Sequence, residues 1–156
     1  MNPLDILLKE NEVLRKDLIK LEEMTYSPSV NSRDFSFIFK SLIRFWDEHS
    51  SKEDKILRVL EQEGFNVFLE NMRFRYGRLK ELRDRILDAI KSGRDEDIKH
   101  VLKNDCCEII DTLRAHIIAS DDVLSSIEWS KLRNSAVERI QLLQIIPNDK
   151  IARFRK

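Results

Sequence analysis

FWDEHSSKEDKIL, residues 45–57, occupies the middle of a long amphipathic segment with helical periodicity. His49 and Glu53 in this stretch fall on the face that is otherwise apolar. Because they are four residues apart, about one helical turn, both side chains point the same way. A histidine and a carboxylate that converge inside a helical bundle form either half of a metal site or a buried hydrogen bond. The other helices must show what meets this pair.

Helical periodicity extends over most of the chain. The predicted helices cover residues 3–24, 33–63, 66–91 and 95–124, and a shorter one covers 128–146. Asn2 and Ser32 are the expected caps of the first two helices, and Ser125 or Ser126 is the expected cap of the last. A capping-box pattern at residues 50–53 would also allow a new helix to begin at Ser50. One continuous helix is favoured there, because the apolar stripe keeps its phase on both sides.

Four long helices with short connections predict an all-α protein, an up-down-up-down antiparallel four-helix bundle with a short C-terminal helix. A chain of 156 residues is long enough for one domain with a real core. We expect the bundle over residues 1–127 and the C-terminal helix, packed on the bundle or extending it, over 128–147. A basic tail that frays is expected over 148–156.

Composition argues against several classes of partner. The 28 basic and 28 acidic residues give a formal net charge of zero, which argues against a nucleic-acid binder. No run of about 18 uncharged apolar residues exists, so no membrane span is expected. The N-terminal residues do not resemble a signal peptide, so a cytoplasmic location is expected.

The remaining cysteines and histidine have ordinary interpretations. Cys106 and Cys107 are adjacent, and neighbouring side chains on a helix point about 100° apart, so a disulfide between them is not expected. They are predicted to be small hydrophobic residues in a reducing cytosol, with a redox or metal role as the alternative. His100 lies about 160° around its helix from His116, so a surface position is predicted.

Every one of the four long apolar stripes is interrupted near its middle by polar residues. The interrupting residues are Asn11, His49 with Glu53, Tyr76, and His116 with Ser120 and Asp121. Counting along the helices places the first three interruptions at one depth. The fourth fits less well, because His116 lies about 21 residues after the expected helix start. Unpaired buried polar groups cost about 1–3 kcal/mol each, so these residues should meet each other, a ligand or an ion. Histidine nitrogen with carboxylate oxygen suits iron, zinc or manganese.

Five motifs in order resemble the hemerythrin-like (HHE cation-binding) family of four-helix bundles. They are LLKENEVLRKDLIKLEE (7–23), FWDEHSSKEDKIL (45–57), MRFRYGRLKEL (72–82), LRAHIIASDDVL (113–124) and SSIEWSKL (125–132). The resemblance implies a non-haem diiron centre with five histidines and two bridging carboxylates. Family members carry or sense oxygen, sense iron or redox state, or handle reactive oxygen and nitrogen species.

Carried over residue by residue, the resemblance gives an incomplete ligand set. This chain keeps His49, Glu53 and His116, with Asp121 in a His-x4-Asp position. The departures are Asn11 in place of the first-helix histidine, Met72 and Tyr76 in place of third-helix histidines, and Ser120 in place of a glutamate. Asp121 is rotated about 140° from His116, so it needs a helix bend to converge.

The expected function is therefore a divergent cation-binding or sensory domain related to oxygen, redox state or iron. One iron or other transition-metal ion, in a mononuclear or degenerate diiron site, would be held by the four retained residues, with Tyr76 as a further ligand or a hydrogen-bond partner. Asn11 is expected to bond to Tyr76 or His49. The alternative is a metal-free interaction module that uses an exposed helix face or the 128–146 segment to bind itself or a protein partner. An enzyme is not expected, because no nucleophile–base pair is visible.

Overall fold

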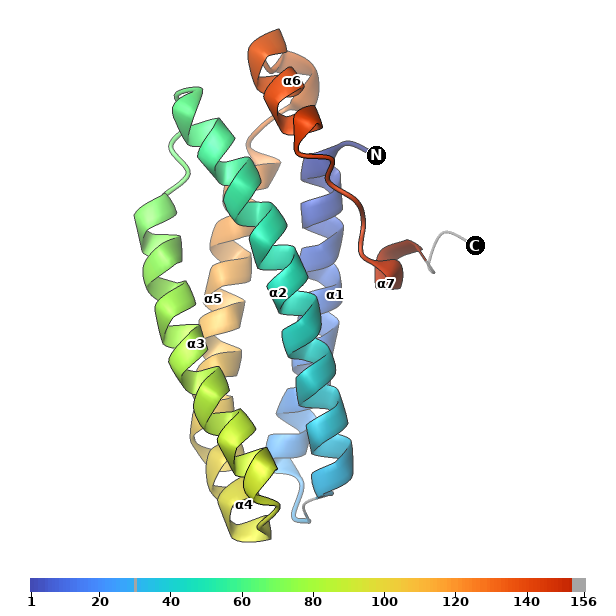
Figure 1. The fold of residues 1–156 in the computed structure, drawn as a ribbon, viewed down its shortest axis with the longest axis vertical. Helices are drawn as coiled ribbons and strands as arrows, with labels where there is room; N and C mark the ends of the chain where they lie inside the picture. The colour runs from blue at the N-terminus through green and yellow to red at the C-terminus, as the bar shows by residue number, and fades with distance from the viewer. Residues whose placement is uncertain (30, 153–156) are drawn as a thin grey trace.

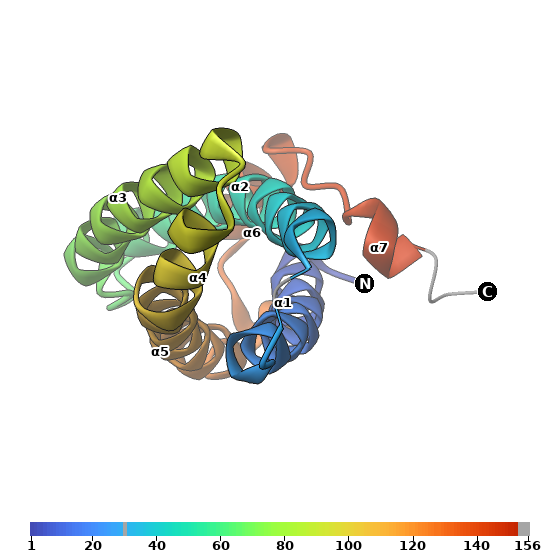
Figure 2. The same cartoon turned by 90° about the horizontal axis from the view of Figure 1, so that it is seen from below.

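The computed structural model describes residues 1–29 and 31–152, and in these residues it is all-helical. The elements are α1 (Pro3–Tyr26), α2 (Ser32–Gln62), α3 (Leu69–Ser92), α4 (Asp95–Lys103), α5 (Asp105–Ser125), the 3-10 turn η1 (Trp129–Lys131), α6 (Asn134–Leu142) and α7 (Asp149–Ala152). The long helices α1, α2, α3 and α5 lie alongside one another (Figures 1 and 2). Both α1 and α3 pack against α2 and α5. The fold is thus a helical arrangement consistent with a bundle.

Local chemistry explains where the first two helices begin. The Asn2 side chain accepts a hydrogen bond from the Asp5 backbone N–H at 3.0 Å, and the Asp5 carboxylate accepts one from the Asn2 N–H at 3.4 Å. This capping box confirms the predicted cap of α1. The predicted cap of α2 is wrong by one residue. Asn31 accepts the hydrogen bond of the Asp34 N–H at 3.1 Å, and Ser32 is the first helical residue.

The middle of α2 is unbroken. The helix runs through His49 and Glu53, so the prediction of one continuous helix is confirmed and no helix begins at Ser50. Gly64 follows the helix at φ 96°, a conformation that glycine adopts without steric cost. The next helix, α3, begins at Leu69 rather than at residue 66. Phe68 before it lies in the left-handed region at φ 52°, which delays the start.

The prediction of one helix over residues 95–124 is wrong. The chain breaks at Asn104, between α4 and α5, where ψ is −77°. The Asn104 side chain donates to the His100 carbonyl at 2.8 Å, and asparagine competes with helix hydrogen bonding in this way. His116 therefore follows the start of α5, at Asp105, by 11 residues (116 minus 105). The depth predicted for His116 did not match that of the other polar residues because its helix begins at Asp105 and not at Asp95.

The C-terminal predictions also need correction. Residues 128–146 form η1 and α6 rather than one helix, because Leu132 has extended backbone at ψ 146°. The expected fraying of 148–156 is wrong for α7, where Ile151 is buried and Lys150 donates to Asp17 at 2.9 Å. This segment packs along α1 (Figure 1). Residues 153–156 lie outside the described residues.

The apolar core has two parts. One cluster fills the end of the molecule near α4, with Leu18, Phe39 and Leu82 among its members, and the other fills the opposite end, with Leu7, Leu57 and Val123. On each of α1, α2 and α5 the buried polar residues lie in sequence between members of the two clusters. A polar layer therefore separates two apolar halves.

Three further expectations can be compared with the structure. His100 is exposed, as predicted. Both cysteines are free, and no disulfide joins them, as expected; Cys106 is buried and Cys107 is exposed. Among the described residues no helix is long and apolar enough to span a membrane.

Candidate functional site

The polar layer contains six side chains that are almost completely removed from solvent. They are Glu10 and Asn11 from α1, His49 and Glu53 from α2, and His116 and Ser120 from α5. Sequence reasoning identified all of them except Glu10. Tyr76, from α3, completes the layer, so each of the four long helices contributes to one connected group.

Glu53 is the centre of this group. His116 Nε2 lies 2.6 Å from Glu53 Oε1, and the Ser120 hydroxyl donates to Glu53 Oε2 at 2.7 Å. The Tyr76 hydroxyl also donates to Oε1, at 2.9 Å. Both oxygens of one buried carboxylate are thus satisfied by groups from α3 and α5. Of the two roles expected for Tyr76, the structure gives it the hydrogen bond.

His49 lies between two carboxylates. Its Nδ1 lies 2.9 Å from Glu10 Oε1, a hydrogen bond that fixes the ring. Its Nε2 lies 3.3 Å from Glu53 Oε2, which is within ion-pair distance. That contact does not meet the geometry of a hydrogen bond, so Nε2 is left without a hydrogen-bond partner. His49 therefore links α1 to Glu53. A hydrogen bond joins its Nδ1 to Glu10 on α1, and charge attraction joins its Nε2 to Glu53.

Glu10 is the residue that sequence reasoning missed. Its Oε2 accepts from Lys52 Nζ at 2.8 Å and from the Asn148 backbone N–H at 3.0 Å. The signal was present, because Leu7, Glu10 and Leu14 follow the three- and four-residue spacing of the apolar stripe. A carboxylate at such a position needs buried partners. Lys52 and the segment before α7 supply them.

The electrostatics follow from this geometry. Burial favours the neutral acid at Glu53, but the neighbouring His116 and His49 outweigh it and hold the pKa of Glu53 well below 4.5. Burial likewise opposes a charge on His49, yet its contacts with the Glu10 and Glu53 carboxylates raise its pKa to about 9. Burial and the Glu53 charge raise the pKa of Tyr76, which keeps its hydroxyl a donor. Near neutral pH, Glu53 is thus ionised and His49 is protonated, and these opposite charges face each other.

Asp121 does not join this centre. Its Oδ1 accepts from Asn11 Nδ2 at 2.8 Å, and its Oδ2 forms an ion pair with Arg15. The side chain is 25% exposed. Although α5 is continuous from Asp105 to Ser125, Asp121 has no hydrogen bond or ion pair with His116 or Glu53 among the described residues. Asp121 therefore lies on the outer side of the layer.

Asn11 and Met72, which replace family histidines, have different roles in the structure. Asn11 Nδ2 also donates to Ser120 Oγ at 3.1 Å, so the expected bond from Asn11 to Tyr76 or His49 is wrong. The Asn11 carbonyl oxygen has no hydrogen-bond partner. Met72 is buried in the apolar cluster with Leu57 and Leu69 and has no polar role. Asn11 thus ties α1 to α5, and Met72 serves packing alone.

Trp46 shields the layer on the side of α2 and α3. Its ring lies edge-on to His116 with centroids 5.1 Å apart, and it lies 5.8 Å from Tyr76 and 6.1 Å from His49. Trp46 and the neighbouring Phe45 are both buried. Such aromatic contacts are worth about 0.5–1.5 kcal/mol beyond area burial. They hold both imidazoles in place.

The residues of the layer do not fit a metal ion well. Among the described residues, no three histidine, cysteine, aspartate or glutamate side chains are grouped so that they could hold one. His116 Nε2 is already bonded to Glu53, and Asp121 is engaged by Arg15 and Asn11. The carboxylate charges that would attract a cation already face protonatable or charged nitrogen atoms. What the arrangement does directly is connect the four long helices through buried polar contacts.

Comparison of the chain with protein-family models, with curated proteins and with solved structures finds no match. The likeness to the hemerythrin-like family therefore rests on the sequence motifs. A function has to be argued from the buried contacts among Glu53, His49 and His116.

Proposed function

We propose that this chain is a divergent hemerythrin-like, up-down-up-down four-helix bundle that acts as a metal-free helical interaction module. The observation that carries the proposal is the Glu53 carboxylate, whose two oxygens accept hydrogen bonds from His116, Ser120 and Tyr76. A hydrogen-bonded network then stands in the part of the bundle where the family holds its metal. The protein has no catalytic role under this proposal.

The connectivity is supported by packing. Both α1 and α3 pack against α2 and α5, as the members of a four-membered ring would. The connections after α1 and α2 are short, and short connections favour antiparallel neighbours. Polar contacts at one level on all four helices agree with this arrangement.

Charge balance supports the metal-free state. Glu53 faces His49 and His116, and Glu10 faces His49 and Lys52. A cation entering between them would have to displace or deprotonate these partners, because metal ligands must be free of protons. The bundle is stable without a metal if these contacts replace the ligand bonds.

The C-terminal segment is the favoured interaction surface. Leu142 at the end of α6 is 81% exposed and Ile146 is 70% exposed. Large apolar side chains left in water close to each other in sequence are typical of a surface that another protein covers. A second copy of the chain or a different protein would cover them.

A metal-binding sensory function is the second candidate, and one observation favours it. His49 Nε2 has no hydrogen-bond partner, while Glu10 fixes the other ring nitrogen, as an outer carboxylate does for a metal-bound histidine. In this case His49, Glu53 and His116 would have to rearrange around one ion, because the described residues do not group them as a metal site. Iron bound there would supply oxygen or redox chemistry.

Elemental analysis separates the two candidates. Protein expressed in medium supplemented with iron and zinc should contain far less than one metal per chain, and its melting temperature should not rise when metal is added. The matched variant is His49→Gln with His116→Gln, which keeps a polar group at both positions. Near-stoichiometric metal that this variant loses would establish the sensory function and overturn the metal-free one.

Light scattering and partner capture test the interaction function. Leu142→Ser with Ile146→Ser should abolish self-association or binding of a captured protein, whereas Phe74→Ser, at another exposed position, should not. The histidine variant should retain the same oligomeric state. A monomer that captures no protein in either form would contradict the module.

A further inference from the structure

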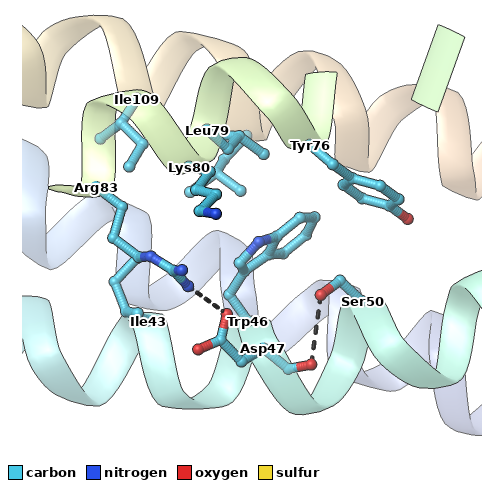
Figure 3. Close-up of a pocket in the computed structure, with 10 residues that line it drawn as sticks. Ile43, Trp46, Asp47, Ser50, Tyr76, Leu79, Lys80, Arg83 and Ile109 are labelled. Carbon is cyan, nitrogen blue, oxygen red and sulfur yellow. Dashed lines mark hydrogen bonds and ion pairs between the residues drawn. The ribbon is translucent and has the colours of Figure 1, made fainter. Parts of the chain in front are cut away.

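A small cavity opens between α2 and α3 beside the buried polar layer. It measures about 150 Å³ and reaches inward to Ile109 and Leu113 on α5. The Trp46 and Tyr76 rings line the cavity beside the polar layer, and Lys80 and Arg83 of α3 also line it (Figure 3). Sites between the helices of a bundle are common places for small ligands.

Two hydrogen-bond donors in this cavity lack acceptors within the described part of the chain. The Lys80 ammonium has no carboxylate partner there, and it is directed toward the same space as Trp46 in Figure 3. Trp46 is only 5% exposed, yet its indole N–H has no acceptor among the described residues. The indole nitrogen is not among the buried polar atoms that lack a partner, so it opens onto the cavity, where its N–H is available to an acceptor on a ligand.

The charge of the cavity favours one negative charge on the ligand. Arg83 Nη1 forms an ion pair with Asp47 Oδ1 at 2.7 Å, which largely cancels both charges. Lys80 then leaves a net charge of plus one. Apart from Ser50, the remaining lining is apolar and aromatic, and it includes Ile43, Leu79 and Ile109.

We propose that this cavity binds a small organic carboxylate with a flat apolar body, of about the size of benzoate. The carboxylate would accept from Lys80 Nζ and from the Trp46 indole N–H. The apolar body would lie against Leu79 and Ile109. A cavity of roughly 150 Å³ lined by apolar side chains is large enough for a benzene ring. This site does not depend on whether the polar layer binds a metal.

The experiment uses the full chain with Trp129→Phe, so that Trp46 is the only one of the two tryptophans left to report binding. Titration with benzoate should give a saturable change in fluorescence, with a Kd on the order of 1 mM. In ¹H–¹⁵N spectra the Trp46 indole resonance should shift in the same range. Benzyl alcohol, which lacks the charge, should bind at least roughly tenfold more weakly.

Two variants identify the charged contact. Lys80→Met should weaken benzoate binding by at least about tenfold while helix content and melting temperature stay unchanged, and Lys80→Arg should retain it. Lys40→Met, at an exposed position on α2 that does not line the cavity, is the matched control and should bind as before. Absence of saturable binding, equal binding by Lys80→Met, or equal binding of inorganic phosphate would each overturn the proposal. Metal analysis of the same samples reports separately on the polar layer.

Discussion

The carboxylate of Glu53 and the imidazole of His116 meet at 2.6 Å, between Oε1 and Nε2, although 63 residues separate them in sequence. Their helices, α2 and α5, each pack against α1 and α3, so this contact crosses the centre of the structure. It lies between two apolar clusters and is fully buried. Effects of changing either residue should therefore extend to all four long helices.

Glu53→Gln should be strongly destabilising. The substitution keeps the shape but removes the negative charge that faces His49 and His116. Breaking a buried pair by removing one partner costs about 3–5 kcal/mol; here Glu10 still faces His49, but the counter-charge on the Glu53 side is lost. Urea unfolding would measure this loss. Glu61→Gln, at an exposed position on the same helix, should change the free energy of unfolding by no more than about 0.5 kcal/mol. Similar losses in the two variants would show that Glu53 has no special role.

Tyr76→Phe tests the hydrogen bond from α3. The change removes only the hydroxyl that donates to Glu53 at 2.9 Å and keeps the ring that contacts Trp46. Hydrogen bonds to charged groups contribute about 1.5–3 kcal/mol, so the free energy of unfolding should fall by that amount. Tyr26→Phe, where the ring is 80% exposed, is the control and should be neutral. An unchanged Tyr76→Phe protein would mean that the phenol serves only to fill volume.

Stability should depend on pH through His49 and Glu53. The pKa of His49 is raised from 6.5 to about 9, so its contribution is complete below pH 6.5 and is lost as the pH rises through about 9. The pKa of Glu53 is lowered below 4.5, so its contribution is present above pH 4.5 and is lost as the pH falls through the folded-state value. Stability should therefore be greatest at about pH 5–6.5.

The alkaline decline should amount to on the order of 3 kcal/mol between pH 6.5 and 9. His49→Gln cannot titrate, so it should lower stability at pH 6 but show a much flatter profile above pH 6.5. Urea unfolding at a series of pH values measures both slopes. A profile with the same alkaline slope in the variant would assign that slope to other groups.

The segment that leads into α7 should protect Glu10. The Asn148 N–H donates to Glu10 Oε2, and the buried Ile151 holds α7 in place. Ile151→Ala should detach this segment and raise hydrogen exchange of the Asn148 amide by roughly tenfold or more, while exchange in the middle of α2 stays slow. Ile146→Ala, at a 70% exposed position, should leave the Asn148 amide protected. Equal exchange in both variants would show that Ile151 does not hold the segment.

The helical parts of the fold were accessible from sequence because their signals are local. Apolar spacing predicted α1 to within two residues at its end and α2 as one helix through His49 and Glu53. The break at Asn104 was missed, because periodicity continues across it while a side-chain hydrogen bond to the His100 carbonyl ends α4. A side-chain hydrogen bond that competes with the helix backbone involves only a few atoms, so it does not change the spacing of the apolar residues.

The sequence by itself determined that polar residues interrupt every long stripe and that His49, Glu53 and His116 belong to the buried layer. Only the tertiary structure decided their partners: Glu10 and Glu53 at His49, Ser120 and Tyr76 at Glu53, and Arg15 at Asp121. Periodicity fixes which side of a helix a residue occupies, because it depends on the backbone repeat alone. Partner choice depends on how helices pack and on which rotamer each side chain adopts, and those are settled between segments far apart in the chain.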